Sequence, residues 1–361
     1  MATPLGEKLA AIIAADGPIS IADYMRHCLA DPQHGYYATR DPLGAAGDFV
    51  TAPEISQMFG ELIGAWLVHA WRAAGAPVPA ILAEAGPGRG TLMADILRAA
   101  SIDPAFVNAI SVHLVETSPA LRDKQKAMLS GLSGVKAPVT WHERIEDVPE
   151  GPLFFIANEF FDALPIRQYI RTGGQWRERV VGLGDTGNLA LGLGPGRLDR
   201  PIKDAPEGAI VEIRPAATAI MDIIAGRIAA SGGAALIIDY GYGQAAFGDT
   251  FQAVRNHAFA DPLTEPGEAD LTAHVDFAAL ARSARKAGAA AHGPMDQGAF
   301  LLATGLLERA ARLGAGKDAQ TRDAISEAVE RLAGPDAMGA LFKVLAVTHT
   351  GLVLPPFDGA N

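Results

Sequence analysis

The chain has 361 residues, of which 30 are Lys or Arg and 41 are Asp or Glu, so its formal net charge is −11 at pH 7. This acidic balance argues against a nucleic-acid-coating protein, because such proteins carry a basic face. Hydrophobic residues make up 49% of the chain, a proportion that excludes global disorder. The single cysteine, Cys28, excludes an internal disulfide and a cysteine-only metal cage, and it indicates a reducing compartment.

The first quarter of the chain has mainly helical patterns. Residues 4–30 predict one or two helices, the second capped by Ser20 with Asp23 three residues later. After a loop over 31–53, residues 54–74 carry apolar side chains at helical spacing and predict one long helix. We expect residues 1–76 to form an N-terminal helical region with a long structured loop.

From residue 77 to 361 short apolar runs alternate with helical stretches. We predict strands over 80–85, 111–115, 153–157, 234–239 and 342–348, and helices over 91–100, 118–130 and 216–230. Strands that alternate with helices predict an α/β fold with a doubly wound, Rossmann-like sheet. Two insertions interrupt it: 166–194 predicts an antiparallel β meander, and 296–338 predicts a helical pair that suits a homodimer surface as well as a core.

The sharpest local signal is the sequence ILAEAGPGRGTL over residues 81–92. Glycines allow the turn and a ligand's close approach, and the helix N-terminus behind them offers free N–H groups. A dinucleotide fingerprint would place a third glycine at Thr91, so the loop fits S-adenosylmethionine better than a pyrophosphate. An ordinary strand-to-helix turn is the alternative. The candidate cofactor residues here are Glu84, Gly86, Pro87, Gly88, Gly90 and Thr91.

Acidic residues also end the next two predicted strands. Glu116 follows the strand over 111–115, where an acid accepts hydrogen bonds from ribose hydroxyls. Capping of the following helix is the alternative role. The segment FFIANEFFDALP over 154–165 places Asn158 and Glu159 at a strand end and Asp162 three residues later. Such acids could hold a cationic acceptor or take its proton, or they could cap a short helical turn.

The sequence resembles the family of mitochondrial complex I assembly-factor methyltransferases and their bacterial MidA-like relatives, a branch of the class I S-adenosylmethionine-dependent methyltransferases. The resemblance covers nearly the whole chain, and its most specific parts are GDFVTAPEISQMFGE at 47–61 and NEFFDALP at 158–165. Further matching segments are HGYY at 34–37, EAGPGRGTL at 84–92, IDYGY at 238–242, ADLTAHVDF at 269–277, QGAFLLATGLLERA at 297–310 and LFKVL at 341–345.

The resemblance implies a class I methyltransferase fold, S-adenosylmethionine as cofactor, and methylation of an arginine on a complex I (NADH dehydrogenase) core subunit. A guanidinium stays protonated below pH ~12, so carboxylates must orient it. Glu159 is the first choice for that role, with Asp162 and Glu54 behind it. Glu54 is included because the 47–61 segment is expected to fold over the methyl end of the cofactor. Thr51 is a further cofactor candidate, although it or Glu54 could equally cap a helix.

Several other residues have competing interpretations. Trp141 and His142 lie where class I enzymes often contact adenine, with core packing as the alternative for Trp141. His274 and Asp276 are expected to cap a helix that begins near Val275, with a place in the acceptor site as the alternative. The arginines of the meander are expected to form a solvated edge that discourages strand pairing, with phosphate binding as the alternative; they are Arg167, Arg171, Arg177 and Arg179.

Two other functions compete with methyl transfer: an assembly chaperone that only binds its partner, and a nicotinamide-dependent oxidoreductase, which Thr91 disfavours. We predict a protein substrate, no metal site, no nucleic acid and no stable membrane insertion, since no stretch reaches the ~20 apolar residues of a membrane span. The expected location is the cytoplasm in a bacterium or the mitochondrial matrix in a eukaryote.

Overall fold

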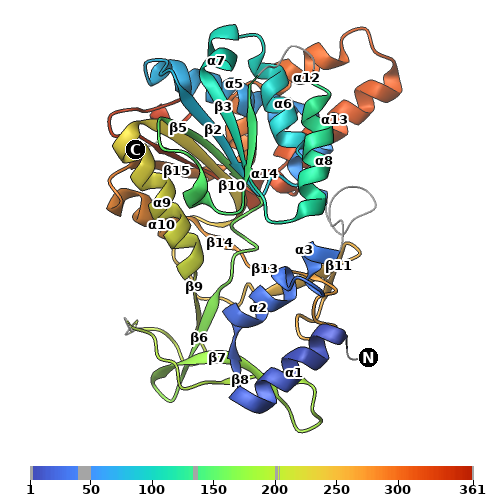
Figure 1. The fold of residues 1–361 in the computed structure, drawn as a ribbon, viewed down its shortest axis with the longest axis vertical. Helices are drawn as coiled ribbons and strands as arrows, with labels where there is room; N and C mark the ends of the chain where they lie inside the picture. Colours follow the sequence, from blue (N-terminus) through green and yellow to red (C-terminus); the bar gives the residue numbers. More distant parts are fainter. Residues whose placement is uncertain (1–2, 40–49, 133–136, 200–201, 203, 360–361) are drawn as a thin grey trace. The chain divides into compact units, whose positions relative to one another are not determined.

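The computed structural model describes residues 3–39, 50–132, 137–199, 202 and 204–359 (Figure 1). Contacts divide the chain into two compact units. The first comprises 1–49, 162–217 and 245–274, and the second comprises 50–161, 218–244 and 275–361. This division differs from the predicted boundary after residue 76, because residues 50–76 group with the second unit. Among the described residues, no helix is long and apolar enough to cross a membrane.

The second unit is built on an eight-stranded sheet. Its strands follow the order β15 (Ala290–Asp296), β16 (Phe342–Thr348), β10 (Gly233–Tyr242), β5 (Leu153–Asn158), β2 (Ala80–Ala85), β3 (Ile110–Val115) and β4 (Val139–His142), and β14 (Val275–Asp276) pairs with β10. The strands from β10 to β4 are parallel, whereas β16 runs antiparallel to both of its neighbours. The predicted doubly wound α/β sheet is confirmed.

The strand order reverses in the middle of this sheet. The strands β3 and β4 follow β2 on one side, while β5 and β10 lie on the other. In open α/β sheets ligands bind at the carboxyl ends of the strands beside such a reversal. The ends of β2, β3 and β5 are therefore where a site is expected.

Helices cover both faces of this sheet, which explains why every residue of β2 and β5 is buried. One face carries α5 (Gln57–Ala73), α6 (Thr91–Ala100), α7 (Pro104–Ala109), α8 (Pro119–Ser130), α11 (Gln297–Ala303), α12 (Leu306–Gly314) and α13 (Ala319–Ala333). The helices α9 (Pro215–Ser231) and α10 (Phe277–Lys286) cover the other face (Figure 1).

The helices α5 and α6 pack unusually closely. A Cβ atom on Gly60 would lie 2.5 Å from the Asp95 Cβ, and one on Gly64 would lie 2.9 Å from the Ile96 carbonyl oxygen. Two glycines four residues apart thus form a flat strip on one side of α5. They bring α5 against the helix that follows the glycine loop.

The predicted long helix over 54–74 is in fact two helices. The short α4 (Ala52–Ile55) ends at Ser56, whose extended backbone (φ −161°, ψ 139°) separates it from α5. The Ser56 hydroxyl then accepts a hydrogen bond from the Met58 N–H and caps α5. Apolar spacing alone missed this break, because the periodic side chains continue across it.

The first unit combines the N-terminal helices with the β insertion. Its larger sheet is antiparallel, in the order β1 (Ile19–Ser20), β7 (Gln175–Leu183), β6 (Arg167–Thr172) and β9 (Ile210–Ile213), with β8 (Leu189–Leu193) beside β7. A smaller sheet contains β11 (Gln252–Arg255), β12 (Ala258–Ala260) and β13 (Asp270–Thr272). The helices of this unit are α1 (Pro4–Asp16), α2 (Ile21–Ala30) and α3 (Tyr36–Thr39). The predicted meander is confirmed and gains β1 and β9. The Ser20 hydroxyl accepts a hydrogen bond from the Asp23 N–H at the start of α2, so the predicted cap is confirmed.

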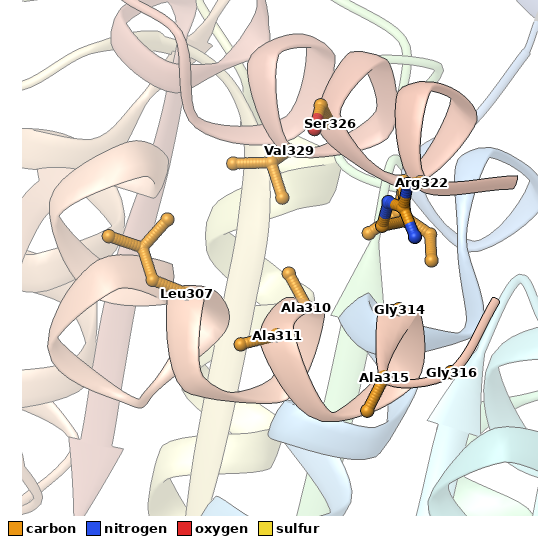
Figure 2. Close-up of a pocket in the computed structure, with 10 residues that line it drawn as sticks. Leu307, Ala310, Ala311, Gly314, Ala315, Gly316, Arg322, Ser326 and Val329 are labelled. Atoms are coloured by element: carbon orange, nitrogen blue, oxygen red, sulfur yellow. The ribbon is translucent and has the colours of Figure 1, made fainter. Parts of the chain in front are cut away.

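The helical insertion has more elements than the predicted pair. Residues 296–338 form α11, α12 and α13, and a fourth helix, α14 (Met338–Leu341), follows. Gly305, with a φ of 101°, separates α11 from α12. A cavity of about 550 Å³ lies between α12 and α13, lined mainly by small and apolar side chains such as Leu307 and Val329 (Figure 2). No residue of the glycine loop lines it.

Candidate functional site

The glycine loop leaves β2 and enters α6 through three residues with left-handed backbone. The φ angles of Gly86, Gly88 and Gly90 are 65°, 53° and 86°, values that residues other than glycine rarely adopt. A Cβ on Gly86 would also lie 3.0 Å from the Phe160 ring. The Gly90 N–H donates to the Pro87 carbonyl at 2.7 Å, which closes the turn. The N-terminal N–H groups of α6 are thereby presented at the end of β2.

Glu84 lies in this strand with its carboxylate buried. Glu84 is 2% exposed, and its Oε2 has no hydrogen-bond partner within the described part of the chain. Burial, and after it the neighbouring charge of Glu116, raises the pKa of Glu84 to about 8. The Asn158 Oδ1, at the end of β5, is likewise buried without a described partner. Buried acceptors of this kind are normally satisfied, so both fit a ligand that brings its own donors.

Glu116 follows β3 and is held in place from several directions. Its Oε1 accepts the Ser118 N–H at 2.8 Å, and its Oε2 accepts from the Gln125 amide at 3.3 Å. The Ser118 hydroxyl, rather than Glu116, caps α8 by accepting the Leu121 N–H. Burial is the largest influence on its carboxyl group and raises the pKa of Glu116.

Gln125, on α8, is a residue that sequence reasoning missed. Its Nε2 donates to the Gly88 carbonyl at 2.7 Å, and its Oε1 accepts from the Trp141 indole N–H at 2.8 Å. The sequence did contain a signal. Gln125 stands between Leu121 and Leu129 on the buried stripe of α8, where an apolar side chain would be expected.

Trp141 and His142 end β4, beside β3. The Lys126 ammonium lies over the Trp141 ring, 5.7 Å from its centroid. The His142 ring stacks on His113, with 2.9 Å between His142 Nε2 and His113 Nδ1. Burial lowers the pKa of both imidazoles, that of His113 to about 4. The His142 carbonyl accepts the Glu116 N–H, so its main chain helps to position Glu116.

The short helix α4 is bonded to the residue that follows β5 and to the first residue of α6. The Glu159 Oε1 accepts hydrogen bonds from the Ala52 N–H and from the Asn158 Nδ2, both at 3.1 Å. The Glu54 Oε1 accepts from the Thr91 hydroxyl at 2.7 Å, at the start of α6. Of the predicted catalytic carboxylates, Glu159 therefore lies at the carboxyl end of β5 and Glu54 lies beside the glycine loop.

Glu159 also has a strained backbone, with a φ of 50°. Left-handed backbone at a residue with a side chain costs free energy, and it is concentrated at functional sites. The Glu159 N–H donates to the Ile238 carbonyl at 2.9 Å, which fixes this conformation between β5 and β10.

The remaining predicted residues have other placements. Thr51 occupies the N-cap position of α4, but its side chain makes no capping hydrogen bond. Asp162 belongs to the first unit, where it is 7% exposed and its carbonyl accepts the Ala273 N–H. Residues 47–49 of the 47–61 segment lie outside the described residues.

The prediction that His274 and Asp276 cap α10 is correct for Asp276 and wrong for His274. Asp276 caps α10 by accepting the Ala279 N–H at 2.8 Å. His274 does not cap it, because β14 separates His274 from the helix, which begins at Phe277. The His274 N–H donates instead to the Thr250 hydroxyl at 3.0 Å.

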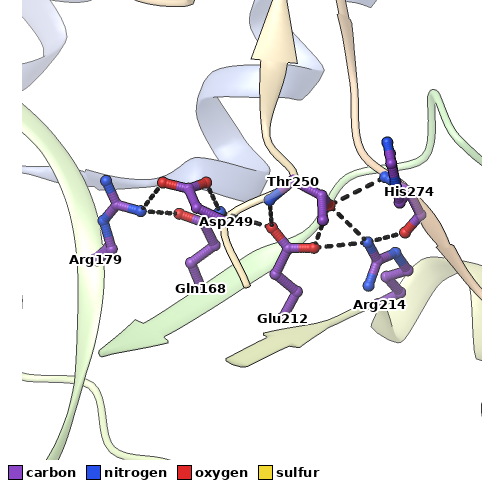
Figure 3. A network of polar contacts seen from close by, with 7 residues as sticks. All are labelled: Gln168, Arg179, Glu212, Arg214, Asp249, Thr250 and His274. Atoms are coloured by element: carbon purple, nitrogen blue, oxygen red, sulfur yellow. Dashed lines mark hydrogen bonds and ion pairs between the residues drawn. The ribbon is translucent and has the colours of Figure 1, made fainter. Parts of the chain in front are cut away.

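A polar network in the first unit contains one of the meander arginines, Arg179 (Figure 3). Arg179 binds Asp249 at 2.6 Å in this network. Outside the network, Arg167 makes two bonds to Glu178 at 2.6 and 2.7 Å. The edge interpretation is wrong for the four meander arginines, because the strands that carry them, β6 and β7, are paired on both sides. The network also contains the buried ion pair Glu212–Arg214, whose side chains are only 2% and 3% exposed, and its members are Gln168, Arg179, Glu212, Arg214, Asp249, Thr250 and His274.

Comparison with known proteins identifies the family. Residues 62–295 match the family model of the S-adenosyl-L-methionine-dependent methyltransferases. The chain is 40% identical to the mitochondrial protein arginine methyltransferase NDUFAF7 of Danio rerio, over 95% of this chain and 86% of that protein. It is 37% identical to the Homo sapiens protein of the same name, over 96% and 83%.

A solved structure agrees with these relatives. A protein from Burkholderia thailandensis, described as a likely methyl transferase and bound to S-adenosyl-homocysteine, superposes with a TM-score of 0.83 at 30% identity, covering 96% of this chain and 92% of that one. The family decides between the cofactors that the glycine loop left open. This chain belongs to the S-adenosylmethionine-dependent methyltransferases.

Proposed function

We propose that this enzyme transfers a methyl group from S-adenosylmethionine to an arginine side chain of a protein substrate. The names of relatives that match 95% or more of the chain support the arginine acceptor. We further propose that the substrate is a core subunit of respiratory complex I, methylated during assembly in the mitochondrial matrix or, in a bacterium, in the cytoplasm. The family resemblance of the sequence motifs supports this choice.

We assign the cofactor to the ends of β2, β3 and β5. Bound there, S-adenosylmethionine supplies an electrophilic methyl group on a sulfonium. Glu84 offers its unpaired carboxylate oxygen to the ammonium group of the cofactor, and Glu116 offers its carboxylate to the ribose hydroxyls. The glycine loop leaves room for the backbone to approach. Trp141 and His142 border the adenine, and Asn158 contributes a further acceptor.

We assign the acceptor guanidinium to Glu159, with Glu54 as a second carboxylate and Asp162 as a third candidate. The observation that carries this assignment is that α4 is bonded to both Glu159 and Thr91, which places two carboxylates beside the glycine loop. Methyl transfer is an in-line displacement in which positioning supplies most of the rate. A carboxylate that orients the guanidinium and disperses its positive charge is what such a site requires.

The substitution Glu159→Gln tests this role. We expect S-adenosylhomocysteine affinity, measured by calorimetry, to stay within about twofold of the wild type. Methylation should fall by about 10²- to 10³-fold, the usual effect of removing one electrostatic contact. The assay is transfer of radiolabelled methyl to complex I extracted from cells that lack this gene, followed by peptide mapping.

Glu327→Gln is the matched control, because Glu327 is exposed on α13. It should leave both affinity and turnover unchanged. Wild-type turnover in Glu159→Gln would remove Glu159 from the mechanism. If peptide mapping finds no methylated arginine with the wild-type enzyme, the proposed acceptor is wrong.

A further inference from the structure

Gln125 connects three parts of the cofactor site through one side chain. Its amide contacts the Gly88 carbonyl of the glycine loop, the Glu116 carboxylate after β3 and the Trp141 indole of β4. It is fully buried on α8. A Cβ on Gly90 would lie 3.4 Å from the Gln125 Cα, so the glycine loop also packs directly on the α8 backbone.

The chemistry of these partners fixes the orientation of the amide. The Gly88 carbonyl and the Glu116 carboxylate only accept hydrogen bonds, whereas the indole N–H only donates. The NH₂ group of Gln125 must therefore face Gly88 and Glu116, and its oxygen must face Trp141. Neither a carboxylate nor an apolar side chain of similar length can make this set of bonds.

We infer that Gln125 is a positioning residue for the adenosine part of the cofactor, because it holds the glycine loop, the ribose-binding carboxylate and the indole in one fixed arrangement. This inference rests on the proposed location of the cofactor site. It does not depend on the identity of the acceptor, because its test measures cofactor binding alone.

The test uses Gln125→Met, which keeps the side-chain length and removes all three hydrogen bonds. We expect at least a tenfold rise in the Kd for S-adenosylhomocysteine and a similar factor for 5′-methylthioadenosine, which has the adenosine but no amino-acid group. Gln125→Glu is a second variant. It turns a carboxylate toward the Gly88 carbonyl and Glu116, and should weaken binding further. Ala127→Glu adds the same charge at an exposed position of α8 and should bind like the wild type.

A double-mutant cycle separates positioning from general support of the fold. If Gln125 acts partly through the indole, Gln125→Met and Trp141→Phe will affect the Kd non-additively. A purely structural role would lower the melting temperature of the unliganded protein and leave the Kd unchanged, and this result would overturn the inference.

Gly88→Val distinguishes failure of the inference from failure of the proposed site. Its branched side chain should abolish binding if the site lies at this loop. Lost binding in Gly88→Val together with a wild-type Kd in Gln125→Met would refute only the role of Gln125. Wild-type binding in Gly88→Val would refute the location of the site, and the role of Gln125 with it.

Discussion

We predict that one substitution of Glu84 will raise the stability of the unliganded protein and lower its affinity for the cofactor. The pKa of Glu84 is about 8 in the folded chain, against an ordinary value of 4.5, chiefly because of burial. At about 1.4 kcal/mol per pKa unit, keeping this group uncharged costs the fold roughly 3 kcal/mol at pH 7, since the unfolded chain ionises it freely. Glu84→Gln has nothing to ionise, so we expect the unliganded variant to be more stable by about 1–3 kcal/mol at pH 7.

The stability difference between Glu84→Gln and the wild type should depend on pH, in a direction set by the raised pKa of Glu84. When folding raises the pKa of a carboxyl group, the group makes its full contribution to stability at a pH below its pKa in the unfolded chain. That contribution is lost as the pH rises toward its pKa in the folded chain. The advantage of Glu84→Gln should therefore be absent near pH 4.5, grow up to about pH 8 and then level off. Urea unfolding of both proteins at several pH values measures it, and an advantage that stays constant with pH would refute the reasoning.

Cofactor binding should change in the opposite direction. Without the carboxylate, the variant has no counter-charge for the ammonium group of S-adenosylhomocysteine, and we expect a Kd about 10- to 100-fold higher, as for a lost buried charge pair. The Kd for 5′-methylthioadenosine, which has no ammonium group, should stay close to that of the wild type. Equal losses for both ligands would show that Glu84 does not face the amino-acid end.

Two predictions concern the packing that supports the site. Gly64→Ala should destabilise the protein by about 1–3 kcal/mol in thermal or urea unfolding, because its Cβ would meet the Ile96 backbone; Gly226→Ala, with open space in α9, should cost nothing or stabilise by up to about 1 kcal/mol. Arg214→Met should cost about 3–5 kcal/mol in urea unfolding, because it leaves Glu212 charged and buried, and adding Glu212→Gln should recover part of the loss. Equal costs for the two glycines, or no loss in Arg214→Met, would contradict these arguments.

Much of the central architecture could be predicted from local patterns. The strand over 80–85, the helix over 91–100 and the last strand over 342–348 have the predicted bounds. Apolar periodicity and glycine placement act over a few residues, so they can be read without knowledge of the fold. The same local signals placed Glu84, Glu116 and Glu159 at strand ends.

The break at Ser56 and the role of Gln125 could not be predicted in this way. Ser56 interrupts a periodic apolar pattern because α4 bonds to Glu159 and Thr91, which are distant in the sequence. The function of Gln125 likewise depends on which strands lie beside α8.

The sequence by itself determined the order of strands and helices, the turn at the glycine loop and the type of cofactor that the loop favours, because these depend on the conformational preferences of neighbouring residues. Only the tertiary structure decided the strand order of the sheet, the division of the predicted helix at Ser56 and the contacts of Gln125 with Gly88, Glu116 and Trp141. The physical reason is that strand pairing and buried hydrogen bonds join groups far apart in the chain, and their free energy depends on all the packing around them at once.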